Sequence, residues 1–257
     1  MGHIRLGMLP RTRRWMEVIE LVGIGGSSAA VASATLDAAE QDLISAAEDV
    51  GLRRAFWLLT QIPDAARSTD FAASLRVLGI AVPEAPSAAD LSAGFTQAID
   101  EHVETTKSRS GTGELAQIAA AETLSALLRD RASTLFGSTN EDVRSELGKM
   151  ATEVQFGRFA RDFFARFTTR YLTYFVSKEL SRQVGGGRYF GDRAQARVFS
   201  SALELHCRQA SKIVESFAGG WYSKARFEKD LSEVRTGKFI AYALKKMRGE
   251  LRRGQSK

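Results

Sequence analysis

The chain has 257 residues, of which 44% are hydrophobic and 26% charged, a composition typical of a folded globular protein rather than a disordered one. A single cysteine, Cys207, excludes an intrachain disulfide framework. No uncharged apolar run reaches the roughly 18 residues that a membrane-spanning helix needs, so we expect no membrane partner.

The net charge of +6 is distributed unevenly along the chain. Residues 1–128 contain 10 Lys/Arg and 16 Asp/Glu, whereas residues 129–257 contain 26 Lys/Arg and 14 Asp/Glu. Such polarity influences association rather than fold. The basic half suggests a phosphate-rich or acidic partner and the acidic half a protein partner. The simpler alternative is that both surfaces are only solvated.

The N-terminal residues resemble an export signal in outline. The Arg13-Arg14 pair precedes an apolar stretch, and Ala30-Val31-Ala32 resembles a small-residue cleavage site. Glu17 and Glu20 lie inside the stretch, however, and charged residues are not expected in the apolar core of a signal peptide. The sequence therefore favours a cytoplasmic protein.

A glycine-rich turn separates the first two predicted helices, which cover residues 12–22 and the segment from Ser27 or Ser28 to about residue 50. The turn, Gly23-Ile24-Gly25-Gly26, resembles the start of a dinucleotide-binding loop. Ser28 stands where the third glycine of G-x-G-x-x-G is required, and no βαβ pattern follows. We interpret the segment as a turn between helices.

Proline positions divide the following segment. Pro63 predicts the end of a helix at the preceding residue, and Asp64 is then expected to cap the next helix. Residues 82–87 form the clearest linker, with Ser87 as the expected N-cap of another helix.

The polar, glycine-containing loop at residues 105–113 is the predicted domain boundary. It separates an acidic N-terminal helical region, residues 1–109, from a basic C-terminal helical bundle, residues 110–257. An alanine- and leucine-rich helix follows from residue 114, and Ser138-Thr139-Asn140 is expected to cap the helix after it.

Residues 151–184 carry aromatic side chains at intervals of three or four, which predicts a long helix buried over most of its surface. The aromatic positions include Phe156, Phe159, Phe163, Phe167, Tyr171 and Tyr174. Arginines, among them Arg166 and Arg170, lie on the same segment, so one strip must face water or an anionic partner. We expect this helix at the centre of the C-terminal bundle, in an all-α fold of about nine or ten helices.

Three further boundaries are predicted in the last third of the chain. Residues 185–191 form a glycine-rich loop, and Gly219-Gly220 closes the helix that begins at residue 192 and ends at about residue 217. Thr236 is the expected N-cap of the last helix, which ends at about residue 253.

The last predicted helix has two chemically distinct faces. Ile240, Leu244, Met247 and Leu251 share the apolar one. The opposite face gathers Lys238, Tyr242, Lys245, Lys246, Arg252 and Arg253. Cationic side chains arranged in this way displace counterions from nucleic-acid phosphates and bind without reading sequence. The alternatives are a solvated helix face or an anionic membrane surface, and the latter is disfavoured by the lack of large aromatics on the apolar side.

Two shorter segments repeat the combination of basic and aromatic residues. Arg188 and Tyr189 lie in the glycine-rich loop, and Lys224 and Arg226 follow Trp221 and Tyr222. We predict that Arg188, Tyr189, Lys224 and Arg226 contact nucleic acid together with the final helix. Tyr189 and Tyr242 are expected to stack on bases.

The sequence offers little support for catalysis. His206 and Cys207 are adjacent on a helix, so their side chains diverge and cannot form a nucleophile–base pair. No HExxH, CxxC or clustered His/Asp pattern offers metal ligands. We therefore predict no catalytic residues, no metal and no cofactor. The remaining enzymatic alternative is a hydrolase with an unfamiliar site.

These patterns together predict a non-catalytic cytoplasmic subunit that binds the phosphate backbone of nucleic acid, DNA or RNA, through its basic C-terminal half and a protein through its acidic N-terminal half. The alternative is a helical adaptor or structural subunit of a bacterial multi-protein complex that makes only protein–protein contacts.

Overall fold

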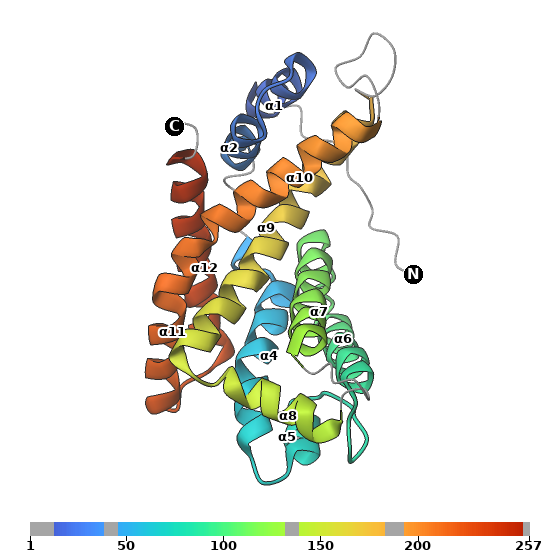
Figure 1. Ribbon diagram of the computed structural model, residues 1–257, viewed down its shortest axis with the longest axis vertical. Helices are drawn as coiled ribbons and strands as arrows, with labels where there is room; N and C mark the ends of the chain where they lie inside the picture. The colour runs from blue at the N-terminus through green and yellow to red at the C-terminus, as the bar shows by residue number, and fades with distance from the viewer. Residues whose placement is uncertain (1–12, 39–45, 132–138, 183–192, 254–257) are drawn as a thin grey trace.

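The computed structural model describes residues 13–38, 46–131, 139–182 and 193–253 (Figure 1). These residues form eleven α-helices and no strand, which confirms the predicted all-α class. The helices are α1 (Arg13–Ile24), α2 (Ser28–Ala38), α4 (Val50–Arg67), α5 (Phe71–Val77), α6 (Ala88–Thr105), α7 (Gly111–Arg131), α8 (Asn140–Lys149), α9 (Glu153–Arg182), α10 (Arg193–Ala210), α11 (Lys212–Phe227) and α12 (Glu233–Arg253).

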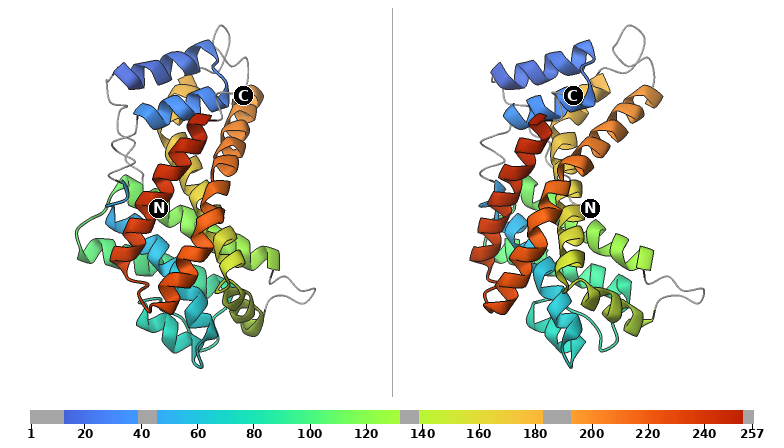
Figure 2. Two further views of the ribbon diagram at one scale, coloured as in Figure 1. Left: turned by 90° about the vertical axis from the view of Figure 1, so that its left-hand side faces the viewer. Right: turned by 60° about the vertical axis from the view of Figure 1, so that its left-hand side comes forward.

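The aromatic helix α9 runs through the middle of the molecule, as predicted. The antiparallel pair α11 and α12 covers one side, and α6 and α7 cover the other (Figures 1 and 2). Helices α1 and α2 lie at one end, while α5 and α8 lie at the opposite end. Helix α9 packs directly against α7, α10 and α11, and it therefore connects the elements on both sides.

An aromatic cluster joins α9 to its neighbours. Phe56 of α4 lies 5.1 Å from Phe163 of α9 and 5.5 Å from Phe239 of α12, measured between ring centroids. Phe156 stacks on Tyr222 of α11 at 3.8 Å. The cluster belongs to one continuous core that includes residues from both sides of the predicted boundary at residues 109 and 110. The division into two domains stays a prediction.

Two predicted helix starts are confirmed in detail. The Ser87 hydroxyl accepts the backbone N–H of Asp90 at 3.2 Å, and the Asp90 carboxylate accepts the backbone N–H of Ser87 at 2.9 Å. Thr139 and Asp142 form the same reciprocal arrangement at the start of α8. Each pair satisfies two backbone donors that a helix N-terminus would otherwise leave without partners, so local sequence is enough to position these ends.

The helix predicted to end before Pro63 instead continues to Arg67. Pro63 removes one intrahelical hydrogen bond, but it is buried within the core-facing side of α4. The end of α4 is held from outside, because Arg144 of α8 donates hydrogen bonds to the carbonyl oxygens of Ala66 and Ser68 at 3.1 and 2.6 Å. Tertiary contacts thus override the local preference. Asp64 lies within α4 rather than at a helix start.

The segment predicted as one helix from Ser27 or Ser28 to about residue 50 contains a helix boundary near its end. Helix α2 ends at Ala38, residues 39–45 lie outside the described residues, and Asp49 caps the new helix α4 by accepting the Leu52 N–H at 2.8 Å. The Asp49 carboxylate also accepts a hydrogen bond from the Ser110 hydroxyl, which precedes α7. One acidic side chain therefore joins the N-terminal ends of α4 and α7.

Gly219 and Gly220 do not end a helix, contrary to the sequence prediction, but lie inside α11. They lie where α11 crosses the start of α9. A Cβ atom on Gly219 would lie 2.8 Å from the carbonyl carbon of Glu153, and one on Gly157 would lie 2.9 Å from the carbonyl oxygen of Glu215. The glycines permit close backbone approach between two helices. The preceding predicted helix is instead divided at Ser211, between α10 and α11.

Candidate nucleic-acid interface

Helix α12 begins three residues before the predicted cap. The Ser232 hydroxyl accepts the backbone N–H of Arg235 at 3.3 Å, and the Arg235 guanidinium pairs with Glu228 and Asp230 at 2.6 and 3.3 Å. Thr236 is fully buried inside the helix and is not its N-cap. The ion pairs tie the start of α12 to the turn after α11, which sets the direction in which α12 projects.

The predicted apolar face of α12 is confirmed as its buried face. Ile240, Leu244, Met247 and Leu251 are at most 3% exposed. Contrary to the expectation that this side lacks large aromatics, Phe239 lies on it and stacks on Trp221 of α11, with ring centroids 4.1 Å apart. Because the helix is held along one side, the opposite side is presented to solvent.

The exposed face of α12 carries Lys238, Tyr242, Lys245 and Lys246. Within the described part of the chain, none of the three lysines has a carboxylate within ion-pair distance. The Lys246 ammonium lies 5.4 Å from the centroid of the Tyr242 ring. These four residues, here called the lysine strip, concentrate positive charge around one aromatic ring. The side chains of Arg252 and Arg253 lie outside the described residues.

Tyr242 is oriented by the neighbouring helix. Its ring meets Phe217 of α11 edge-on at 4.9 Å, and 47% of the residue remains exposed. The contact with Phe217 and the cation–π contact with Lys246 restrict the rotamers of the tyrosine before any ligand arrives. A partly exposed ring held in this way can stack on a nucleobase.

The other predicted contact residues are placed differently. Arg226 pairs with Asp64 of α4 at 2.7 Å and donates to the carbonyl oxygen of Ala151 at 3.0 Å, so it links three elements of the fold. Lys224 is exposed and lies 3.9 Å from Glu228. Arg188 and Tyr189 lie outside the described residues. The described residues therefore bring together only the members on α12.

Most arginines of the aromatic helix face carboxylates from other helices. Arg158 and Arg161 lie 3.6 and 2.8 Å from Glu215 of α11, and Arg170 pairs with Glu122 of α7. The arginine strip of α9 thus meets acidic partners within the protein. These pairings reduce the net positive charge around α9. They distinguish its paired arginines from the lysines of the strip on α12.

The two residues considered for nucleophilic chemistry are unsuited to it. Cys207 is buried, and burial raises the pKa of its thiol to about 12, so the reactive thiolate is scarce near neutral pH. His206 is half-buried, and loss of hydration lowers its pKa although the backbone of Leu251 opposes the shift. Within the described ranges, no three His, Cys, Asp or Glu side chains are grouped so that they could hold a metal ion.

None of the helices in the described parts of the chain is sufficiently long and apolar to cross a lipid bilayer. Comparison with known proteins finds no matching family model, no matching curated protein and no matching solved structure.

Proposed function

We propose that this protein is a non-catalytic, cytoplasmic nucleic-acid-binding subunit that contacts phosphates through the lysine strip of α12. One observation carries the proposal: Lys238, Lys245 and Lys246 are exposed and have no carboxylate partner among the described residues. The described arginines of α9 are all paired with carboxylates. An ammonium group that is not already neutralised gains most from meeting a phosphate, because binding releases condensed counterions.

The dimensions of the strip suit a nucleic-acid backbone. Lys238 and Lys245 are seven residues apart, which corresponds to about 10 Å along a helix at 1.5 Å per residue. One strand of a duplex presents a phosphate about every 3.4 Å along its axis, so the strip spans about three phosphates. Lysine lacks the planar guanidinium group with which arginine forms two parallel hydrogen bonds to a base edge. The proposed binding is therefore independent of sequence.

The proposal is tested by neutralising the strip. Labelled single-stranded DNA, double-stranded DNA and RNA are each titrated over a salt series with two proteins. One is the wild type, and the other is a triple variant that combines Lys238→Gln, Lys245→Gln and Lys246→Gln. Losing three phosphate contacts should reduce the slope of log K against log[salt] by about 2 to 3. The control combines Arg13→Gln, Arg67→Gln and Lys149→Gln, three exposed positions on α1, α4 and α8 with the same change in net charge.

The comparison between the two triple variants shows whether the lysine strip or the net charge of the protein drives binding. Equal losses of affinity would mean that net charge, and not the strip, drives association. Negligible binding of all three nucleic acids by the wild type at about 50 mM salt would reject the proposed function altogether.

Tyr242 provides a test of strand state. If bases stack on the exposed ring, Tyr242→Ala should weaken single-stranded binding by about 1–3 kcal/mol and leave duplex binding nearly unchanged, because duplex bases already stack on one another. Tyr242→Phe retains the ring and serves as the matched control. An equal loss for both variants would argue against stacking.

A protein-only adaptor is the second candidate, and two exposed apolar side chains support it. Phe227 and Val234 are 87% and 68% exposed and lie at the same end of the α11–α12 pair. Copurification of the tagged protein from its native cells tests this function. Two results together would favour the adaptor: the double variant Phe227→Ser, Val234→Ser loses a protein that copurifies with the wild type, and the wild type has no affinity for nucleic acid. For the nucleic-acid-binding subunit, the proposed protein-docking surface is instead the acidic N-terminal half.

A further inference from the structure

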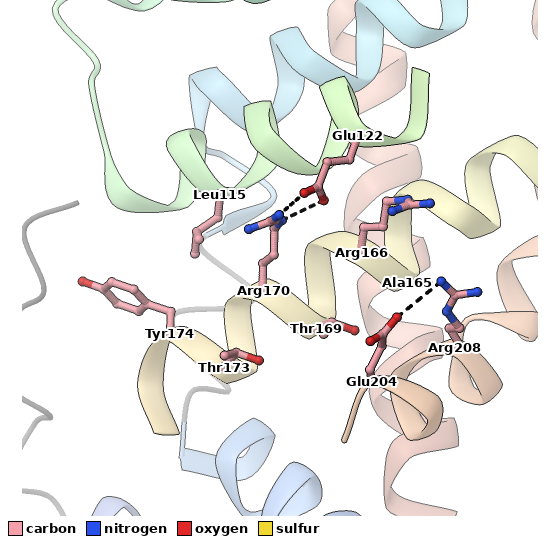
Figure 3. Close-up of a pocket in the computed structure, with 10 residues that line it drawn as sticks. All are labelled: Leu115, Glu122, Ala165, Arg166, Thr169, Arg170, Thr173, Tyr174, Glu204 and Arg208. Atoms are coloured by element: carbon pink, nitrogen blue, oxygen red, sulfur yellow. Dashed lines mark hydrogen bonds and ion pairs between the residues drawn. The ribbon is translucent and has the colours of Figure 1, made fainter. Parts of the chain in front are cut away.

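A pocket of about 530 Å³ lies between α7, α9 and α10 (Figure 3). Its charged lining comprises Arg166 and Arg170 of α9, Arg208 of α10, and two glutamates, Glu122 and Glu204. Pockets that bind small molecules have volumes of roughly 300–1,000 Å³, so this one can accept a ligand much larger than a single ion. The pocket does not involve α12 and is separate from the lysine strip.

Carboxylates orient the three arginines. Arg170 donates from both Nε and Nη2 to Glu122, Arg166 donates from Nε to Asp162 at 2.9 Å, and Arg208 lies 3.3 Å from Glu204. Figure 3 shows Arg170 fixed against Glu122 and Arg208 against Glu204. Because Arg166 and Arg170 are partly buried and paired before a ligand binds, they lose less rotamer entropy on binding than free side chains would.

These ion pairs do not exhaust the guanidinium donors. A guanidinium has five N–H donors, and the contacts to carboxylates use one or two on each arginine. Each of the three arginines has one carboxylate partner (Asp162, Glu122 or Glu204), so the charges balance and a ligand would meet the guanidinium N–H groups that these pairs leave unused. Thr169 and Thr173 add hydroxyl groups to the same lining. The set of donors therefore suits an anion.

A phosphate monoester fits this arrangement better than a carboxylate. Its three terminal oxygens offer more acceptor sites than the two oxygens of a carboxylate, so it can accept from two guanidinium groups and from the threonine hydroxyls together. The volume leaves room for an organic group beyond the phosphate. Leu115, Ala165 and the Tyr174 ring provide apolar surface, and Figure 3 shows the ring at the opposite end of the pocket from Arg166 and Arg208. A planar base could lie against this ring.

We infer that the pocket between α7, α9 and α10 binds a small phosphorylated molecule with a planar organic group, of which a mononucleotide is the chemical type. The phosphate is held by Arg166 and Arg208, and Arg170 fixes the wall between the phosphate and the base. The inference does not depend on the proposed contact between α12 and nucleic acid, because the two surfaces share no residue.

Isothermal titration with AMP, GMP, CMP, UMP and inorganic phosphate tests the inference. At least one mononucleotide should bind the wild type, and Arg166→Gln, Arg208→Gln should weaken that binding by about tenfold or more, as expected for loss of hydrogen bonds to a charged group. The control outside the pocket is Arg158→Gln, also on α9, which should bind as the wild type does. The lysine-strip variant should also retain mononucleotide binding.

Hydrogen exchange of the unmutated protein provides a second measurement that does not depend on the folding of a variant. A bound mononucleotide should slow exchange in residues 166–174 and 204–208. The inference is wrong if no mononucleotide binds at about 1 mM, if the double variant binds as tightly as Arg158→Gln, or if protection appears on α12 instead. Inorganic phosphate binding as tightly as every mononucleotide would also reject the organic part of the ligand.

Discussion

The contact between α9 and α11 predicts that two adjacent glycines respond oppositely to the same substitution. A Cβ on Gly219 would lie 2.8 Å from the carbonyl carbon of Glu153. The nearest atom to a Cβ on Gly220 would be Oε1 of the flexible Glu153 side chain, at 3.6 Å. Backbone cannot move aside as a side-chain terminus can. We therefore expect Gly219→Ala to destabilise the protein and Gly220→Ala to stabilise it.

The magnitude follows from two opposing effects. Overpacking costs about 1–3 kcal/mol, and a backbone obstacle favours the upper value. Replacing glycine by alanine inside a helix contributes about 0.5–1 kcal/mol of stability at both positions. The helix contribution cancels in the difference between the variants, so that difference reports the steric cost alone, about 3 kcal/mol.

Urea unfolding followed by far-UV circular dichroism measures this difference. With a denaturant dependence of about 3 kcal/mol per M, the unfolding midpoint of Gly219→Ala should lie about 1 M below that of Gly220→Ala. Gly157→Ala should also lower the midpoint, because its Cβ would lie 2.9 Å from the Glu215 carbonyl oxygen. Midpoints of Gly219→Ala and Gly220→Ala that coincide would refute the close approach of α9 and α11.

Three further predictions concern single side chains. Asp49→Ala should lower the free energy of unfolding by about 1–2 kcal/mol, because it removes the cap of α4 and the acceptor for Ser110; unchanged urea unfolding would contradict this role. Cys207 should resist alkylation by iodoacetamide at pH 8 until the protein is unfolded, since burial raises its pKa to about 12; rapid labelling of the folded protein would count against the burial. The pKa of His206 is lowered by desolvation, so the unfolded state binds this proton more readily than the folded state, and the free energy of unfolding should fall as the pH drops below 6.5. The fall should be smaller in His206→Gln. An equal pH dependence of stability in the two proteins would disprove the linkage.

The local elements of the fold follow closely from the order of residues. Ser87 with Asp90 and Thr139 with Asp142 form capping boxes from side chains three positions apart, and such contacts need no tertiary partner. The aromatic spacing of α9 and the two faces of α12 likewise depend only on helical periodicity. These features were predictable because their interactions lie within about one helical turn.

Sequence reasoning was wrong where distant segments supply the deciding contact. Proline and glycine often end helices, yet Pro63 and Gly219 both lie inside helices. Arg144 caps the end of the helix that contains Pro63, and Gly219 packs against the backbone of Glu153. The pocket was missed for the same reason. Arg170 and Glu122 are 48 residues apart, and nothing in either local sequence indicates that they meet.

The sequence by itself determined that the chain is helical, where most helices begin, and that α12 has a basic face. Tertiary structure decided which positive charges meet carboxylates of other helices and which are exposed to solvent. The physical reason is range: helical periodicity and capping act over a few residues, whereas charge pairing acts through space between helices that are far apart in the chain. Arg161 and Arg170 of α9 meet carboxylates of α11 and α7, whereas the described residues place no carboxylate within ion-pair distance of the three lysines of α12.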